Sequence, residues 1–179
     1  MGDPRRLKKK FSRPRRAMDV ARISEDKGYT KRYGLKNKRE IWKAQRFLNE
    51  IKGQARALLT KGSGGAEEFI SRLVTLGMLS EEATLDDVLA IDLDRILDRR
   101  LQTVVYRTDL ANTVRQARQL IAYGHIAING NRVRSPGYLV KRSEERSIGF
   151  VHRSPLNDEG HVARGIKAEG GEEEKSDAQ

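Results

Sequence analysis

An Asn-Gly pair at positions 129–130 restricts the fold of this chain more than any other local feature. The pair separates two short apolar stretches in "HIAINGNRV", which spans residues 125–133. A type I′ turn requires positive φ at both of its central residues, and Asn-Gly meets that requirement well. The sequence therefore predicts a β-hairpin, with Ile126 and Ile128 on one face of its first strand.

A short helix is predicted directly before the hairpin. Thr113 and Gln116 fit the pattern of an N-terminal capping box, so the helix should begin at about Val114. Gly124 can take the left-handed conformation that ends a helix. Apolar residues recur at helical spacing along this segment. The opposite face carries Arg115, Arg118 and Gln119.

One further helix and one further strand complete the predicted unit. Apolar residues keep helical spacing from Leu93 to Val105 and predict a single helix. The outward face of that helix carries Arg95, Arg99 and Gln102. "SPG" at 135–137 predicts a turn, and "SIGFV" at 147–151 predicts a closing strand. The predicted fold class is therefore mainly α with a small antiparallel β-sheet, an α+β architecture.

Charge narrows the possible partners. The chain has 36 Lys and Arg against 25 Asp and Glu, and a formal net charge of +11. A chain this basic favours a polyanion, either nucleic acid or an anionic membrane. No apolar run approaches the roughly 20 residues of a membrane span, and no signal peptide is evident. With no cysteine there is neither a disulfide framework nor a thiolate metal site, and a cytoplasmic location fits.

Charge is also unevenly distributed. Residues 1–61 hold 20 basic and 6 acidic side chains, whereas residues 62–98 hold 2 and 9. Residues 99–153 are basic again, and the acidic end of the chain predicts disorder. The predicted organisation is a basic arm (1–37), a helical lobe (38–92), the helix-and-hairpin module (93–153) and a flexible acidic tail (154–179).

The arm opens with "GDPRRLKKKFSRPRR", which has too few apolar residues to fold alone. It is either a solvated, disordered segment or one that becomes ordered against phosphates. The density of like charge favours the second interpretation, since binding would release condensed counterions. Its candidate RNA-binding residues are Arg5, Arg6, Lys8, Lys9, Lys10, Arg13, Arg15 and Arg16.

A long helix is predicted from about Lys38 to Thr60, because apolar residues form one stripe along it. A second face carries Arg39, Lys43 and Arg46, which either remain solvated or contact phosphates. Trp42 borders the apolar stripe, and the edge of the core is a better interpretation for it than base stacking. "KGSGG" at 61–65 predicts a flexible break and lacks the spacing of a phosphate-binding loop.

The lobe should continue with short acidic helices as far as residue 92. Thr84 and Asp87 predict another capped helix start.

The module presents a candidate basic surface at its helix and hairpin. Phosphate and sugar contacts suit this surface better than base stacking, because no long aromatic series lies along it. Structured RNA is therefore the predicted ligand. The predicted contact residues are Arg99, Arg115, Arg118, Gln119, His125, Arg132 and Arg134.

These residues also carry a resemblance. "RRLQTVVYRTDLANTVRQARQLIAYGHIAINGNRV" resembles the S4 (αL) RNA-binding domain in its Ala-Arg-Gln-Leu helix, its Gly-His-Ile and its Asn-Gly hairpin. "GDPRRLKKKFSRPRR", "YGLKNKREIWKAQ" and "TLDDVLAIDLDRILDRRLQ" are similar to the archaeal branch of the small-subunit ribosomal protein four family. The resemblance extends over about residues 2–153.

The resemblance implies a structural constituent of the small ribosomal subunit. It implies primary binding of small-subunit rRNA at a multi-helix junction, a role in nucleating assembly, and an influence on decoding accuracy. Implied partners are neighbouring small-subunit ribosomal proteins and mRNA near its entry path, with no membrane and no small-molecule substrate. Some bacterial relatives carry a cysteine zinc knuckle, but this chain has no cysteine, so no metal or cofactor carries over. Gln116 stands where many relatives have Glu.

Three alternatives remain. A free-standing RNA-binding chaperone or ribosome-associated factor could use the same module. An enzyme is possible because the module is appended to pseudouridine synthases and to a tRNA synthetase, but no catalytic domain is evident and no cue joins the three histidines to a nucleophile or metal set. A DNA-binding protein would need a helix-turn-helix or zinc-finger pattern, and neither is present.

Overall fold

The computed structural model describes residues 9–61 and 65–157. These residues form two compact units, one built from residues up to 74 with 78–97, the other from 75–77 with residues from 98 onward. The sequence placed the boundary before residue 93, whereas residues 93–97 pack with the first unit. The α+β architecture is confirmed, because helices dominate and one small antiparallel sheet lies in the second unit.

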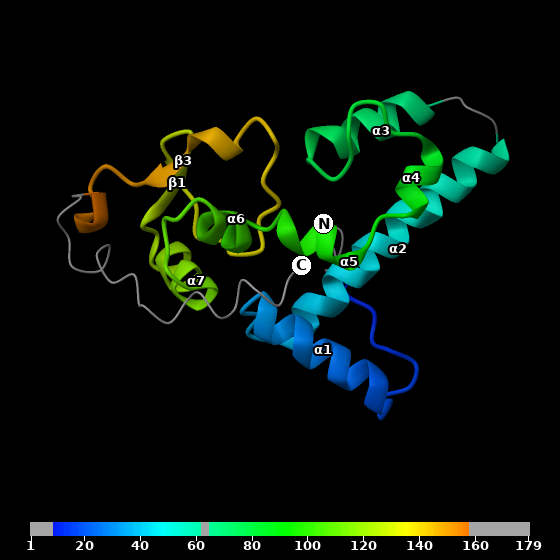
Figure 1. Cartoon of the computed structure of the whole chain (residues 1–179), viewed down its shortest axis with the longest axis horizontal. Helices are drawn as coiled ribbons and strands as arrows, with labels where there is room; N and C mark the ends of the chain where they lie inside the picture. The colour runs from blue at the N-terminus through cyan, green and yellow to red at the C-terminus, as the bar shows by residue number, and fades with distance from the viewer. Residues whose placement is uncertain (1–8, 62–64, 158–179) are drawn as a thin grey trace, which may run out of the picture. The chain divides into compact units, whose positions relative to one another are not determined.

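The first unit is helical. Its elements are α1 (Val20–Arg32), α2 (Lys38–Lys61), α3 (Ala66–Thr75), α4 (Leu85–Leu89) and most of α5 (Leu93–Asp98). The predicted long helix is confirmed in α2, whose stripe from Ile41 to Ala55 is buried. Figure 1 shows α1 against the amino-terminal part of α2 and α4 beside α2, and both pairs are in contact. Burial of this stripe, more than helix propensity, stabilises the unit.

Helix α1 was not predicted, because the sequence assigned its residues to the arm. Its N-cap is Asp19, whose carboxylate accepts the backbone N–H of Arg22 at 3.5 Å. At its other end, the Tyr33 hydroxyl donates to Asp94 of α5 at 2.9 Å. Within the helix itself only Asp26 is fully buried, so α1 lacks the apolar stripe by which α2 could be recognised.

The capped start of α4 is confirmed. The backbone N–H and the hydroxyl of Thr84 both donate to Asp87 Oδ2, at 2.8 and 3.0 Å. These two hydrogen bonds hold the pKa of Asp87 below its ordinary value, because they stabilise the carboxylate over the protonated acid.

The second unit combines helices with a three-stranded antiparallel sheet. Its elements are α6 (Leu101–Arg107), α7 (Val114–Tyr123), β1 (Ile126–Ile128), β2 (Asn131–Arg132), η1 (Glu145–Ser147), β3 (Ile148–Phe150) and η2 (Pro155–Asn157). The strand order is β2-β1-β3. Leu101, Val105, Ile121, Ile126 and Val140 form the centre of its buried core.

The single helix predicted from Leu93 to Val105 is wrong: the structure has two helices, α5 and α6. Between them Arg99 lies in a turn, and Arg100 is extended and forms an antiparallel bridge with Leu139. Val140 N–H donates to Arg99 O at 2.9 Å, and Leu101 N–H donates to Tyr138 O at 2.8 Å. Pairing with a segment some forty residues away therefore interrupts a run whose local spacing is helical.

The helix-and-hairpin prediction is confirmed. Asn129 and Gly130 have φ of 50° and 76°, and Gly124 ends α7 with φ of 81°. The Thr113 hydroxyl accepts the Gln116 N–H, but Gln116 Oε1 accepts the N–H of Asn112, one residue before the cap. The predicted cap is thus present, with its return hydrogen bond reaching one residue further back.

The end of the described chain belongs to the folded module. Residues 154–157, which the sequence assigned to the acidic tail, include η2, and both Ser154 and Leu156 are buried. The remainder of the predicted tail, 158–179, and the centre of the predicted break at 61–65 lie outside the described residues.

Candidate nucleic-acid interface

Helix α7 carries the first part of the candidate surface. Arg115 and Gln119 are exposed on it, as the helical spacing predicted. Arg118 is half-buried, and its guanidinium donates to the side-chain oxygen of Gln102 at 3.3 Å. Gln102 in turn donates to Val114 O at 3.0 Å. These two hydrogen bonds hold the Arg118 side chain in one position, whereas a solvated arginine side chain would move freely.

The hairpin brings two arginines against the end of α7. A Cβ built on Gly124 would lie 2.9 Å from Arg132 Cδ and 3.0 Å from Arg134 Nε, closer than side chains approach. Gly124 therefore has two roles, since its positive φ ends the helix and its missing side chain leaves room for both arginines. Arg132 and Arg134 remain exposed.

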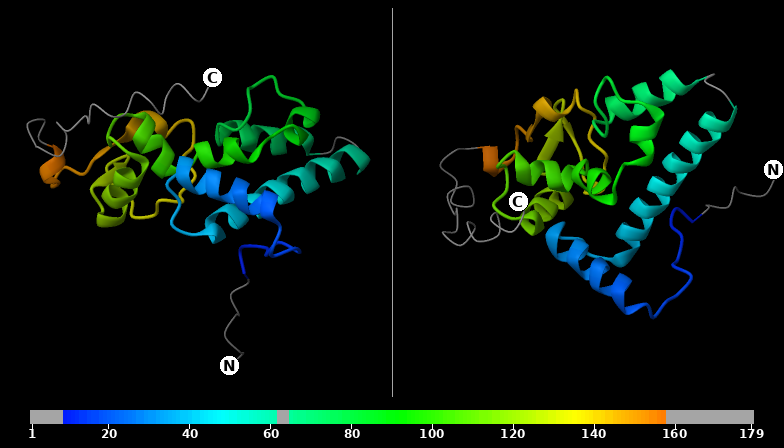
Figure 2. Two further views of the ribbon diagram at one scale, coloured as in Figure 1. Left: turned by 60° about the horizontal axis from the view of Figure 1, so that its bottom comes forward. Right: turned by 45° about the vertical axis from the view of Figure 1, so that its right-hand side comes forward.

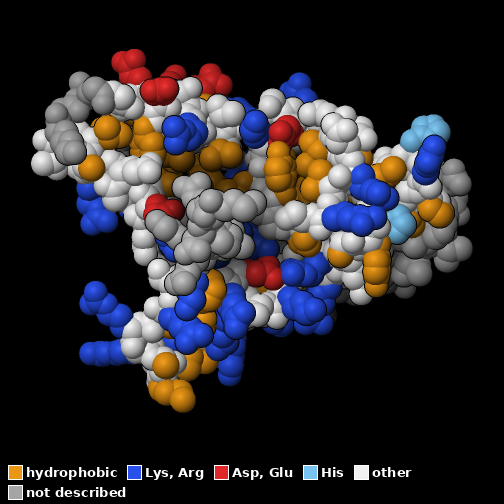
Figure 3. Space-filling model, turned by 180° about the vertical axis from the view of Figure 1, so that it is seen from behind, with side chains coloured by type: hydrophobic (Ala, Val, Ile, Leu, Met, Phe, Trp, Pro, Cys, Tyr) orange, Lys and Arg blue, Asp and Glu red, His pale blue; other side chains and the backbone are white. Residues whose placement is uncertain are grey.

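His125 is held at the base of the hairpin. Its Nδ1 lies 2.9 Å from the hydroxyl of the buried Ser154, and the ring is half-buried. The residues around the helix–hairpin junction thus present three exposed arginines, Arg115, Arg132 and Arg134, together with two partly enclosed side chains, Arg118 and His125. On the face shown in Figure 3, Lys and Arg side chains gather around the histidines of this unit.

Arg99 does not join this surface, contrary to the prediction that it faces outward. Its side chain is only 13% exposed and pairs with Glu145 at 3.1 Å. It also donates to the backbone oxygen of Val140 at 2.9 Å. Gln102 is 1% exposed, so it too points inward. Both predictions relied on one continuous helix, and the break at residues 99–100 turns these side chains into the module.

Tyr138 contributes to the same interior. Its hydroxyl donates to the carboxylate of Glu144 at 2.9 Å. Burial, followed by this hydrogen bond and the negative charge of Glu144, raises the pKa of Tyr138 above its ordinary value. The phenol therefore remains a neutral donor to Glu144. The backbone N–H of Tyr138 separately donates to Ser135 O at 3.2 Å and closes the turn that begins there.

A second basic region consists of the segment before α1 and the first turns of α2. Lys9, Lys10, Arg13, Arg15 and Arg16 are exposed, whereas the predicted contacts Arg5, Arg6 and Lys8 lie outside the described residues. On α2, Arg39 and Lys43 are exposed. Arg46 is bound to Glu50 at 2.7 Å and to the backbone oxygen of Lys9, so it is already engaged within the protein.

Two residues were missed by sequence reasoning. Tyr123 is 72% exposed at the last position of α7, directly before Gly124. Tyr123 lies just outside the apolar spacing of that helix, and this position could have indicated its exposure. Arg22 was read as part of the arm, but its guanidinium binds the carboxylate of the buried Asp26 at 3.0 Å. The i, i+4 spacing of Arg22 and Asp26 was the available signal.

Residues 9–61 and 65–157 also bear on metal binding and membrane insertion. No cluster of His, Asp and Glu there is arranged to hold a metal ion. None of the helices in those ranges is both long and apolar enough to cross a membrane. Exposed arginines on a rigid helix and hairpin are suited to phosphate groups, through charge and paired N–H donors.

Comparison with known proteins agrees with this geometry. The family model described as "S4 domain" matches residues 99–145, which include α6, α7 and the hairpin. A Halobacterium salinarum protein named small ribosomal subunit protein uS4 is 47% identical over 155 residues, covering 86% of this chain and 91% of the relative. Proteins of the same name from Thermoplasma acidophilum and Methanococcus aeolicus are 46% and 44% identical, each over 92% of this chain and over 86% and 96% of the relative.

Proposed function

Because this chain belongs to the family of small ribosomal subunit protein uS4, we propose that it is a structural, rRNA-binding constituent of the small ribosomal subunit. The observation that carries the proposal is the helix–hairpin junction, where Arg115, Arg132 and Arg134 are exposed on a framework fixed by the Asn-Gly turn and by Gly124. Its role is one of binding, and no catalytic step is assigned to it.

The binding mode follows from the side chains available. Arginine guanidinium groups pair with phosphate oxygens, and such contacts fix position and orientation without reading base sequence. Since α7 and the hairpin hold these groups at fixed spacing, the surface selects RNA by the arrangement of its backbones. A junction of several RNA helices offers such an arrangement, and the exposed arginines before α1 add a second set of phosphate contacts.

From this mode we also infer the protein's place in the subunit. A protein that bridges several RNA helices stabilises their packing, which fits early action in assembly of the small-subunit body. Membership of the uS4 family further implies a contribution to translational accuracy. Its partners are then small-subunit rRNA, neighbouring small-subunit ribosomal proteins and mRNA near the entry path. These finer assignments depend on the rRNA assignment and are tested after it.

Crosslinking tests the proposal directly. The purified full chain is crosslinked to total cellular RNA, and the crosslinked fragments are sequenced. We expect small-subunit rRNA to be enriched, with fragments converging on one multi-helix junction. Enrichment of tRNA or mRNA, or crosslinks dispersed over both subunits, would instead indicate a free-standing RNA-binding factor that uses the same module.

A further inference from the structure

The basic segment before α1 is attached to α2 at its beginning. The ring of Phe11 lies against Trp42, with centroids 6.2 Å apart and planes tilted by 34°. The guanidinium of Arg39 lies over the same Phe11 ring, 5.7 Å from its centre. Arg46, one turn beyond Trp42, donates to the backbone oxygen of Lys9. Three side chains of α2 thus hold residues 9–11.

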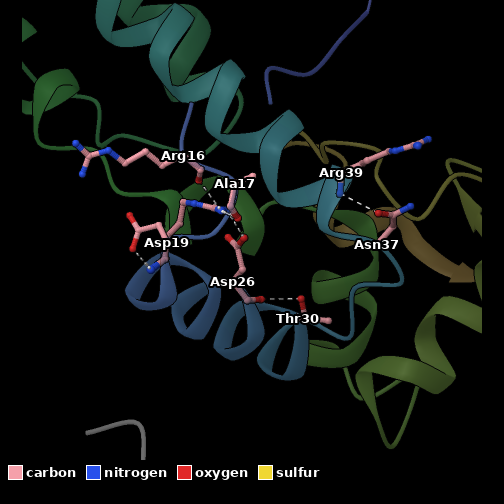
Figure 4. A network of polar contacts seen from close by, with 8 residues as sticks. Arg16, Ala17, Asp19, Asp26, Thr30, Asn37 and Arg39 are labelled. Carbon is pink, nitrogen blue, oxygen red and sulfur yellow. Dashed lines mark hydrogen bonds and ion pairs between the residues drawn. The ribbon is translucent and has the colours of Figure 1, made fainter. Parts of the chain in front are cut away.

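The same segment is attached to α1 at its end. One nitrogen of the Arg22 guanidinium donates to the backbone oxygens of Arg16 and Ala17, at 3.1 and 3.0 Å. Another nitrogen binds the carboxylate of Asp26 at 3.0 Å, and Asp26 is only 6% exposed. Figure 4 shows the Arg16 and Ala17 carbonyls and the Asp26 carboxylate converging on this point. Arg22 therefore holds the backbone of residues 16–17 in place, and its positive charge is neutralised by Asp26 within the protein.

Between the two attachments the segment presents cations to solvent. Ser12, Arg13, Arg15 and Arg16 are exposed, and Pro14 restricts the backbone between them. Figure 2 shows this part of the chain running from the side of α2 to the start of α1. Like charges in a free segment would spread apart, so their confinement requires the attachments at both ends.

We propose that residues 9–17 form a preorganised phosphate-binding strap, with Phe11 and Arg22 as its positioning residues. This inference rests on the proposed rRNA-binding function and adds to it how the first basic region binds. The strap has its RNA-binding conformation before RNA binds, because Phe11 fixes one end on α2 and Arg22 fixes the other on α1. The exposed cations Lys10, Arg13, Arg15 and Arg16 then contact phosphates, while Phe11 and Arg22 contact none.

Measurements on the free protein test the attachment without RNA. The chain has no cysteine, so Ser12→Cys provides a unique site for a spin label on the full-length protein. We expect restricted label motion in this parent and in Phe11→Tyr, and fast motion in Phe11→Ala and Arg22→Ala. Lys10→Ala is the matched control, since it removes a neighbouring exposed charge and should leave the label restricted. A label equally mobile in every variant would overturn the proposal.

Measurements with RNA test the consequence. Small-subunit rRNA transcript is titrated with each unlabelled variant, and a directed hydroxyl-radical probe on Ser12→Cys maps the neighbouring RNA. Phe11→Ala should weaken binding roughly two- to tenfold, because the strap must be ordered on binding, and should spread the cleavage pattern. Its salt dependence should match the parent, whereas Lys10→Ala should reduce the salt slope.

Phe11→Tyr should restore both the affinity and the focused cleavage, which a general loss of folding would not allow. Unchanged affinity and unchanged cleavage in Phe11→Ala would refute the strap. If the parent itself shows no preference for small-subunit rRNA, the proposed function fails, while the label measurements still decide whether the segment is preorganised.

Discussion

The two basic regions of this protein fix their arginines by different means. In the second unit, Arg115, Arg132 and Arg134 stand on a helix and a hairpin whose backbone hydrogen bonds set their positions. In the first unit, Arg13 and Arg15 stand on an irregular segment that depends on a few side-chain contacts at its ends. The comparison shows that charge density alone does not determine how a surface binds. The two regions differ in what makes them rigid, so different substitutions should disrupt them.

The largest expected loss of RNA affinity comes from removing two exposed arginines of the module. If each neutralises one phosphate, Arg132→Ala with Arg134→Ala should weaken binding to the cognate junction about thirtyfold near 0.15 M salt, at roughly fivefold per contact. The log-log salt slope should become shallower by about 2. Filter binding across a salt series measures both quantities.

The matched double variant in the strap sharpens the comparison. Arg13→Ala with Arg15→Ala should change the salt slope by a similar amount, and should weaken binding to cognate and unrelated RNA more evenly. A strap variant that loses cognate preference while the module variant retains it would reverse our assignment of which surface selects the RNA.

A smaller loss of affinity is expected when Gly124 gains a side chain. Gly124→Ala should displace Arg132 and Arg134 and weaken RNA binding by about five- to tenfold, because two phosphate contacts become misaligned without being removed. It should also cost about 1–2 kcal/mol of unfolding free energy, since alanine is strained at positive φ. Affinity and denaturant unfolding are measured on the same preparation.

Gly130→Ala provides the control for backbone strain. Gly130 also has positive φ, but a Cβ there meets no atom within 4 Å. We expect a similar loss of stability and little loss of affinity at temperatures well below the unfolding midpoint. Equal affinity losses in the two variants would mean that strain in the hairpin, and not the position of the arginines, governs binding.

The same comparison explains what could be predicted from the sequence. Helix α2, helix α7 and the Asn-Gly hairpin carry their signals locally, in apolar spacing, caps and turn residues. Helix α1 and the break at residues 99–100 do not, because they depend on contacts made by residues far along the chain.

Site residues followed the same rule. Exposure of Arg115, Arg132 and Arg134 could be read from local pattern, and the structure places all three at the surface. Arg99 could not, since its burial depends on Glu145 and Val140. The strap could not either, because Phe11 contacts α2 only once the chain has passed through α1.

Arg99 supplies a variant that should affect stability without affecting affinity. Arg99→Ala should lower the unfolding free energy by about 1–3 kcal/mol, because Glu145 and the Val140 carbonyl lose a charged donor. RNA affinity measured well below the unfolding midpoint should remain within twofold of the parent. A loss of affinity comparable to that of Arg132→Ala would show that Arg99 reaches RNA after all, and that the module rearranges on binding.

The smallest expected effect on affinity tests whether net charge alone accounts for binding. Asp87→Asn removes one negative charge from the acidic segment between the basic regions and alters neither surface. If affinity followed net charge, this variant would bind more tightly; we expect no change, because only cations placed against phosphates release counterions.

Stability should change instead, and in a way that depends on pH. The hydrogen bonds from Thr84 hold the pKa of Asp87 below its ordinary value of 3.8, so the folded state favours the carboxylate. The stabilisation is fully present above that ordinary value and is lost as pH falls through the lowered folded-state pKa. Thermal unfolding from pH 7 to pH 2 should therefore show the parent and Asp87→Asn converging in acid. Parallel curves would mean that this carboxylate contributes nothing to the start of α4, and a tighter-binding variant would mean that charge outweighs placement.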